Sequence, residues 1–331
     1  METTMTTGEK MLSADSVRAL PLRERVGLVI NTISAREAIQ TIIDAEQAGV
    51  RQLWTTQGPT TIDVLTVLTV AATRTSTIRV GTSILPTYPR HPLVVAAQVS
   101  AFHELAPGRL RLGLGASHRP TIEGIYGIEM TAPLAHTREY VSVLRAALWE
   151  GKVSYHGRFY HVTASLPAPA RVPILVSALG RGAFQAAGEL SDGALSWNCP
   201  VPYLLQTALP ALQEGAKQAQ RPVPPLVAHL PVALATDRQA VLAAARKRLG
   251  VYGRLPFYRH MFADAGYPVP KDGTLPEALL DSLVVSGDEQ TIATRLRNVL
   301  SNGLDELLLL PIPVKDEVQE RSHLAHLIGQ L

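Results

Sequence analysis

Short apolar segments recur along the chain, each rich in β-branched residues or leucine and bounded by residues that favour turns. The pattern predicts eight buried strands, at residues 25–30, 50–56, 78–84, 109–114, 172–178, 193–197, 226–235 and 306–310. The stretches between them predict helices, at residues 35–48, 63–73, 91–105, 133–148, 181–190, 237–249 and 288–301. Residues 155–160 are expected to form a small hairpin.

The alternation of strands and helices predicts a parallel sheet covered by helices. Eight such units without a dividing linker favour a closed (β/α)8 TIM barrel over an open doubly wound sheet. An open sheet normally carries a glycine-rich fingerprint after its first strand, and residues 31–34 contain no glycine. We therefore expect one α/β barrel domain over residues 25–331, with an insertion at about residues 251–276 before the last strand.

Prolines interrupt the chain directly after the third strand. Pro86, Pro89 and Pro92 stand within seven residues, so neither a helix nor a paired strand is expected to continue there. A stiff loop of this kind loses little entropy when it binds a ligand, and it carries Arg90 and His91. On this segment alone, an ordinary surface loop is the favoured interpretation.

Composition excludes several classes of protein. The 331 residues are 46% apolar and 18% charged, which is typical of a folded chain with a large core. The net charge is only +3, and no run of lysine and arginine is interleaved with aromatic residues, so nucleic acid is not an expected partner. The one cysteine, Cys199, excludes an internal disulfide framework and is expected to be a buried, inert thiol in a reducing compartment.

Neither end of the chain suggests a membrane or a secretory route. Residues 1–10 are rich in threonine and lack the apolar segment of a signal peptide, and residues 1–24 are expected to be a loosely held tail. The longest apolar runs, such as residues 307–310, stop at Pro311 and are far too short to span a bilayer. We therefore expect a cytoplasmic protein.

In a barrel of this type, the active site lies where strands end and helices begin. The residues at those positions are mostly glycines and small polar side chains: Asn31, Thr56, Gln57, Ser83, Ile84, Ser117, His118, Ala178, Leu179, Gly180, Arg181, Trp197 and Asn198. They contain neither the carboxylate pair of glycoside hydrolases nor a metal-binding set of His and Asp. A site so poor in acids and bases indicates that a cofactor performs the chemistry.

Residues 178–181 (Ala-Leu-Gly-Arg) form the best candidate site for an anion. They follow the fifth strand and open a predicted helix, where backbone N–H groups and an arginine suit a phosphate. A glycine at such a turn is often only a conformational need, so this signal is weak alone. His118, beside Ser117, is either an acid, a base or a hydrogen-bond donor to a ring, or a plain surface histidine.

Several spaced motifs together resemble the bacterial luciferase-like superfamily of flavin- and deazaflavin-dependent oxidoreductases, over about residues 25–312. They lie at residues 45–49 (AEQAG), 53–54 (LW), 78–81 (IRVG), 88–92 (YPRHP), 108–115 (GRLRLGLG), 138–140 (REY), 155–157 (YHG) and 187–193 (AGELSDG). Within the superfamily, the chain is most similar to a group usually assigned to coenzyme F420. The shared features are residues 117–118 (SH), 122–124 (IEG) and 251–259 (VYGRLPFYR).

The resemblance implies a TIM-type barrel with an insertion, often dimeric, whose tricyclic cofactor lies near the ends of the second, third and fourth strands. It implies a non-proline cis peptide bond behind the ring, at Ser83–Ile84, and a phosphate site at residues 178–181. In full, the implied cofactor-binding residues are Thr56, Gln57, Ser83, Ile84, Pro86, Ala116, Ser117, Ala178, Leu179, Gly180 and Arg181.

One departure from the superfamily concerns the catalytic base. Several of its deazaflavin enzymes, including sugar-phosphate dehydrogenases, carry an Asp-His pair after the second strand, where this chain has Gln57 and Gly58. Their acidic residue after the fourth strand is Ala116 here. Oxidation of a hydroxyl group needs a base, so a sugar-phosphate or alcohol dehydrogenase is disfavoured, and His118 is the remaining candidate base.

These features leave three functional hypotheses. The leading one is an F420-dependent oxidoreductase that moves a hydride between the deazaflavin and a small organic substrate, held by Asn31, Gln57, His118 and Trp197. With no strong base in this set, reduction of an activated acceptor is slightly favoured. The alternative is a two-component FMN monooxygenase fed by a separate reductase, and the third is a non-catalytic flavin- or metabolite-binding barrel.

Two expectations about partners accompany these hypotheses. We expect a homodimer, with an F420 or flavin reductase as the indirect source of electrons. The insertion at residues 251–276 is rich in aromatic residues, and it either closes over the pocket or packs on a partner subunit.

Overall fold

Eight parallel strands close into a barrel in the computed structural model, which describes residues 13–31 and 34–331. Their order around the barrel is β1-β2-β3-β5-β8-β9-β10-β12, and β12 pairs with β1 to close it. Their bounds are β1 (Val26–Ile30), β2 (Gln52–Thr55), β3 (Arg79–Thr82), β5 (Leu110–Gly115), β8 (Ile174–Ser177), β9 (Ala194–Ser196), β10 (Leu226–Ala233) and β12 (Glu306–Pro311). The expected (β/α)8 barrel is confirmed, and every strand overlaps its predicted segment.

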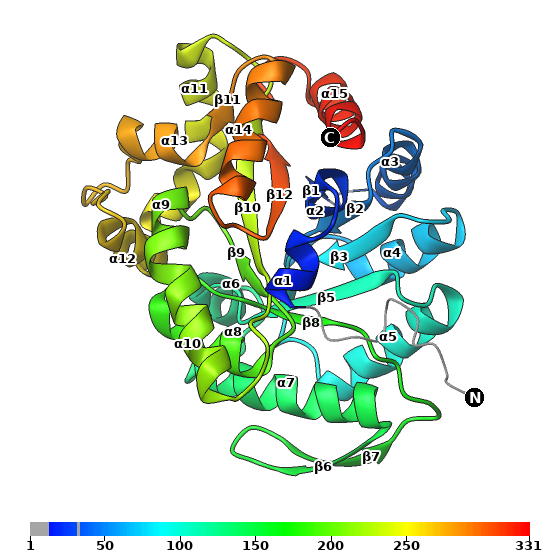
Figure 1. Ribbon diagram of the computed structural model, residues 1–331. Coiled ribbons are helices and arrows are strands. Elements are labelled where there is room, and N and C mark those ends of the chain that lie inside the picture. The colour runs from blue at the N-terminus through cyan, green and yellow to red at the C-terminus, as the bar shows by residue number, and fades with distance from the viewer. Residues whose placement is uncertain (1–12, 32–33) are drawn as a thin grey trace.

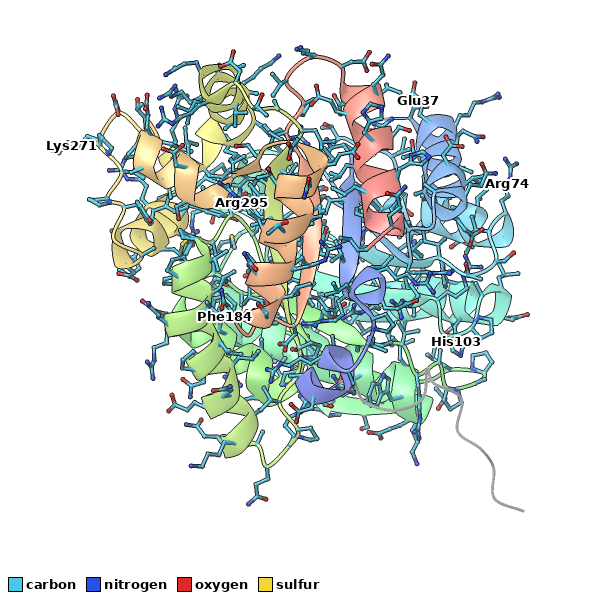
Figure 2. The ribbon with its side chains drawn as sticks, turned by 45° about the horizontal axis from the view of Figure 1, so that its top comes forward. Glu37, Arg74, His103, Phe184, Lys271 and Arg295 are labelled. Carbon is cyan, nitrogen blue, oxygen red and sulfur yellow. The ribbon has the colours of Figure 1, made fainter. Side chains whose placement is uncertain are left out.

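Helices surround this barrel (Figure 1). The longer ones are α3 (Ala35–Gln47), α4 (Val64–Thr73), α5 (Pro92–Leu105), α7 (Pro133–Glu150), α8 (Arg181–Leu190), α10 (Leu209–Gln218), α11 (Arg238–Leu249), α14 (Glu289–Ser301) and α15 (Glu317–Gly329). Local chemistry sets their ends: the Ser34 hydroxyl accepts the Glu37 N–H at the start of α3, and Gly49 has φ 92° just after it. Glu37, Arg74 and Lys271 point outward from the molecule in Figure 2.

The apolar pattern does not predict several further elements, most of them too short for a helical periodicity to appear. They are α1 (Ala14–Arg18), α2 (Leu22–Arg25), β4 (Leu85–Pro86), α6 (Arg119–Gly124), α9 (Val201–Tyr203), η1 (Leu204–Ala208), η2 (Gly250–Arg254), α12 (Pro256–Asp264), α13 (Glu277–Leu283) and β11 (Val285–Ser286), together with the longer α10 and α15. The predicted hairpin is confirmed as the turn between β6 (Lys152–His156) and β7 (His161–Ser165), which lie away from the barrel beside α7 (Figure 1).

Residues 13–24 are not part of a loosely held tail, and that expectation is wrong for them. Ala14 and Val17 are buried, and the Ala14 N–H donates to the Val223 carbonyl at 2.8 Å. Arg18 pairs with the buried Asp305 carboxylate at 2.6 Å. A buried carboxylate needs such a partner, which explains why this segment is held. Residues 1–12 of the expected tail lie outside the described residues.

Pairing also continues past the third strand, where the prolines predict that it stops. β4 pairs with β5, and the Thr87 N–H donates to the Gly115 carbonyl at 2.9 Å. Pro86 lacks an N–H group, but the residue after it supplies the next ladder hydrogen bond. One proline therefore interrupts the ladder here without ending it.

A buried ion pair crosses the amino-terminal half of the barrel. Arg111 on β5 donates to both carboxylate oxygens of Glu306 on β12, at 2.6 and 2.8 Å. Gln52 donates to the same carboxylate at 3.1 Å, and the Trp54 ring lies 5.2 Å from the Arg111 guanidinium. Burial alone would raise the pKa of Glu306, but Arg111 and Gln52 hold that pKa below its ordinary value.

We expect Glu306→Gln to lower the free energy of unfolding by about 3–5 kcal/mol, because the substitution leaves the Arg111 charge buried without its counter-ion. Urea unfolding monitored by circular dichroism measures this change. Glu277→Gln is the matched control: it removes a carboxylate from a surface pair with Arg238 and should change stability far less. Equal effects of the two substitutions would contradict the role given to the buried pair.

Candidate functional site

The β5 side of the barrel mouth is built from small residues. A Cβ atom on Gly115 would lie 2.1 Å from the Ser177 hydroxyl oxygen. A Cβ atom on Gly113 would lie 2.0 Å from the Thr82 carbonyl oxygen and 2.5 Å from the side chain of Leu195 on β9, two strands along the barrel. Only glycine permits approaches this close. The wall that faces the mouth on this side therefore carries no bulky side chain.

The ends of β2 and β3 are joined by hydrogen bonds. The Thr56 hydroxyl donates to the Ser83 carbonyl at 2.8 Å, and the Gln57 N–H donates to the Ile84 carbonyl at 3.2 Å. The Ser83–Ile84 peptide bond is cis, as the resemblance implies. The Ser83 hydroxyl is buried and has no hydrogen-bond partner among residues 13–31 and 34–331. On this side of the mouth, the Ser83 hydroxyl is therefore a polar group whose hydrogen-bonding capacity is unused within the described residues.

The loop after β4 is structural rather than a platform for a ligand. Arg90 pairs with Asp63 at 2.6 Å and also donates to the Gln57 carboxamide oxygen at 3.2 Å. His91 caps α5, where its Nδ1 accepts the Leu93 N–H. Both side chains are occupied within the fold, in agreement with the ordinary-loop interpretation.

Gln57 is turned into its own loop. Its amide nitrogen donates to the Gly58 carbonyl at 2.9 Å, and its oxygen accepts the Val64 N–H at 3.0 Å. The side chain is 8% exposed. Gln57 therefore contributes backbone and shape to the mouth, whereas its carboxamide holds the start of α4. At the end of β1, Asn31 is exposed and adjoins residues 32–33, which lie outside the described residues.

Aromatic rings from the segment 251–276 cover another part of the mouth. The Trp197 indole N–H, after β9, donates to the Tyr252 hydroxyl at 2.7 Å. The His118 ring, after β5, meets Tyr252 and Tyr258 with ring centroids 6.4 and 5.8 Å apart. The insertion therefore packs on mouth residues of its own chain, while Phe257 beside them is 63% exposed.

His118 is neutral at pH 7 in this setting. Burial lowers its pKa from the ordinary value of 6.5. It precedes α6 and makes no capping hydrogen bond with its side chain, and Ser117 before it has φ 62°. Ala116 is half-buried at the end of β5 and brings no acid to the site.

The start of α8 is open. Gly180 is its N-cap and Arg181 its first residue, and a Cβ atom on Gly180 would meet nothing within 4 Å. Ala178 is buried, and the Leu179 carbonyl accepts the Tyr203 hydroxyl at 3.1 Å. The Arg181 side chain is 65% exposed and pairs with Glu214 on α10 at 2.9 Å. The start of α8 therefore has space in front of it, and the Arg181 guanidinium is turned toward α10.

One inward-facing residue of the barrel is missed by the sequence analysis. His229 lies in the middle of β10, is 2% exposed and packs against Trp197 with ring centroids 4.4 Å apart. The available signal is a single histidine in the otherwise apolar run of residues 226–233. Cys199 is buried as expected, and its burial raises the pKa of the thiol to about 12.

Several carboxylates outside the mouth accept backbone N–H groups of loops. Glu46 accepts the backbone N–H groups of residues 76–78, Glu139 those of residues 158–160, and Glu320 those of residues 314–316. Among the described residues, no group of three or more His, Cys, Asp or Glu side chains is placed to hold a metal ion. Within the same residues, no helix is long and apolar enough to cross a membrane.

Known proteins with the same fold use two kinds of cofactor. The chain is 26% identical to a 5,10-methylenetetrahydromethanopterin reductase of Methanolobus tindarius, over 80% of this chain and 86% of the reductase. The structure of a coenzyme F420-dependent tetrahydromethanopterin reductase of Methanopyrus kandleri is similar with a TM-score of 0.74 at 22% identity, covering 92% of this chain and 97% of that one.

A third similar structure is the oxygenating component of 3,6-diketocamphane monooxygenase, encoded on a plasmid of Pseudomonas putida, in complex with FMN. Its TM-score is 0.70 at 15% identity, and the similarity covers 92% of this chain and 97% of that one. The family model for luciferase-like monooxygenases matches residues 16–306. The chain therefore belongs to the luciferase-like monooxygenase family.

Proposed function

We propose that this chain is an F420-dependent oxidoreductase, which transfers a hydride between the deazaflavin and a small organic substrate. The observation that carries the proposal is sequence identity over most of the chain with reductases whose solved counterpart is F420-dependent. The FMN-containing monooxygenase is similar in fold alone.

The small-residue wall of the mouth fits a flat ring. When bound against it, F420 would supply the hydride-transfer chemistry. The unused Ser83 hydroxyl would hydrogen-bond to the ring, and the Thr56 hydroxyl would keep the Ser83 carbonyl in place. The residues proposed to hold the ring are Thr56, Gln57, Ser83, Ile84, Pro86, Ala116 and Ser117.

The start of α8 would bind the cofactor phosphate. Free N–H groups of a helix's first turn attract anions, and Gly180 leaves space in front of them. The surface pair between Arg181 and Glu214 is exposed, so little free energy holds the guanidinium there. Arg181 can therefore turn to a phosphate at small cost, beside Ala178 and Leu179.

The substrate would occupy the opposite part of the mouth, near Asn31, His118 and Trp197. Because its pKa is lowered, the neutral His118 imidazole offers a hydrogen bond but is a weak base. This favours reduction of an activated acceptor over oxidation of an alcohol. A two-component FMN monooxygenase, supplied with reduced flavin by a separate reductase, is the second candidate, since an FMN-containing structure shares the fold.

We also propose that two copies associate through α4 and α5, which pack side by side. Val94 and Leu105 on α5 are 54% and 57% exposed, and the exposed Ala97 and Ala101 lie on the same helical face between them. Val70 on α4 adds a further exposed apolar side chain. A row of this kind is typical of a surface that another chain covers.

Val94→Glu combined with Leu105→Glu should convert the dimer to monomers, because it places charges in an apolar interface. Size-exclusion chromatography with light scattering measures the change. Phe257→Glu is the control, because it adds a negative charge at an exposed apolar residue of the 251–276 segment and should leave the dimer intact. Dissociation by Phe257→Glu alone would assign the interface to that segment instead.

Gly180→Glu should weaken F420 binding by roughly 5- to 1,000-fold, because like charges about 4 Å apart repel by about 1 kcal/mol in bulk water and about 4 kcal/mol near a protein surface. A titration that follows ring fluorescence measures the loss. The fold should persist, since a side chain at this position meets nothing within 4 Å. Gly180→Gln, of equal size but uncharged, should weaken binding less. Unchanged affinity in Gly180→Glu would refute the phosphate assignment.

A further inference from the structure

His229 faces the inside of the barrel. It is level with Leu308 on β12, which in turn is level with Gly27 on β1. A Cβ atom on Gly27 would lie 2.9 Å from both the Leu308 and the Gln52 side chains, and Gln52 bonds to Glu306 inside the barrel. Residues paired across parallel strands share a face of the sheet, so His229 points inward as these residues do.

One ring nitrogen of His229 makes a hydrogen bond, and the other makes none within the described residues. Nδ1 lies at hydrogen-bond distance from the Ser196 carbonyl, which can only accept, so Nδ1 carries the proton. Burial lowers the pKa of His229 to about 4, so the ring is neutral at pH 7. Nε2 is then a bare acceptor, and it is buried with no partner anywhere in the described chain.

A second buried residue, next to Trp197 in the chain, also lacks hydrogen-bond partners within the described residues. Trp197 packs on the His229 ring and is itself tethered to Tyr252 at 2.7 Å, which fixes the indole. Next to Trp197, Asn198 is 1% exposed, and neither its carboxamide oxygen nor its nitrogen has a partner among residues 13–31 and 34–331. A rigid aromatic face thus adjoins buried polar atoms that lack hydrogen bonds.

We propose that Trp197 and His229 form a substrate-recognition site for a planar ring that carries an N–H or O–H group. The ring lies against the indole, and its N–H or O–H donates to His229 Nε2. This inference rests on the proposed function for the presence of a cofactor ring in the same mouth. In the strand order β10 lies directly opposite β3, so His229 is on the far side from the cofactor wall.

A second buried histidine, His136, has the contacts expected of a purely structural residue. His136 is also buried, with a pKa lowered to about 4 by burial, but both of its nitrogens are used. Nε2 meets the Tyr160 hydroxyl at 2.9 Å and Nδ1 the Thr87 hydroxyl at 3.4 Å. An acceptor buried without a partner destabilises a fold, and an N–H or O–H of a ligand that lies against Trp197 would supply the missing hydrogen bond to His229 Nε2.

The test uses a matched pair of probes, 2-naphthol and 2-methoxynaphthalene, in which a methyl group replaces the donor hydrogen of the hydroxyl. Quenching of tryptophan fluorescence in the full-length protein gives both affinities. We expect 2-naphthol to bind about fivefold to tenfold more tightly, the ratio for one hydrogen bond, and His229→Phe to abolish this preference. His136→Phe, which removes the other buried histidine, should preserve it.

A second readout needs no variant and so does not depend on folding. Nitrogen NMR of the labelled protein should show the Nδ1–H tautomer of His229, with an Nε2 resonance that shifts on addition of 2-naphthol but not of 2-methoxynaphthalene. Equal affinities for the two probes, binding of neither, or a preference that survives in His229→Phe would overturn the inference. Failure of F420 to bind, measured separately, would instead refute the proposed function and leave this result standing.

Discussion

The amino-terminal half of the barrel is built around the buried ion pair between Arg111 and Glu306. The pair joins β5 to β12 across the interior, Gln52 donates a further hydrogen bond to the Glu306 carboxylate, and the Arg111 guanidinium packs on the Trp54 ring. Two desolvated charges persist only when each satisfies the other, so the pair fixes how the strands approach at this level. In the carboxyl-terminal half, the β5 side of the mouth is lined by small residues such as Gly115 and Ser177, where a flat ligand can lie.

The distribution of acids explains why the mouth is poor in them. Glu46, Glu139 and Glu320 each accept several backbone N–H groups and so hold loops on the outside of the barrel, and Asp63 and Asp305 hold arginines. The mouth is left with hydroxyls, backbone groups and neutral imidazoles. Such groups position and recognise a ligand but do not perform redox chemistry, which agrees with a flavin- or deazaflavin-dependent family.

The sequence predicts those features that local patterns determine. Apolar runs predict all eight strands of the barrel, Ser34 predicts the start of α3, and the isolation of Cys199 predicts an inert thiol. Features that depend on distant partners are not predictable in this way: α1 is held by Asp305, 287 residues after Arg18, and Gln57 is held by its own loop. The sequence shows His229 only as a residue of an apolar strand. Its inward orientation and its contact with Trp197 follow from the strand register, which the sequence does not reveal. The sequence therefore locates the mouth, but not which of its polar groups are free.

The most direct test of the cofactor assignment is a pair of equilibrium titrations of the purified protein, one with F420 and one with FMN, each followed by the fluorescence of the ring. We expect F420 to bind in the micromolar range or tighter and FMN to bind at least about tenfold more weakly, a difference of about 1.4 kcal/mol. Tight FMN binding with weak F420 binding would contradict this expectation and favour the monooxygenase. Binding of neither would contradict a cofactor-dependent enzyme altogether.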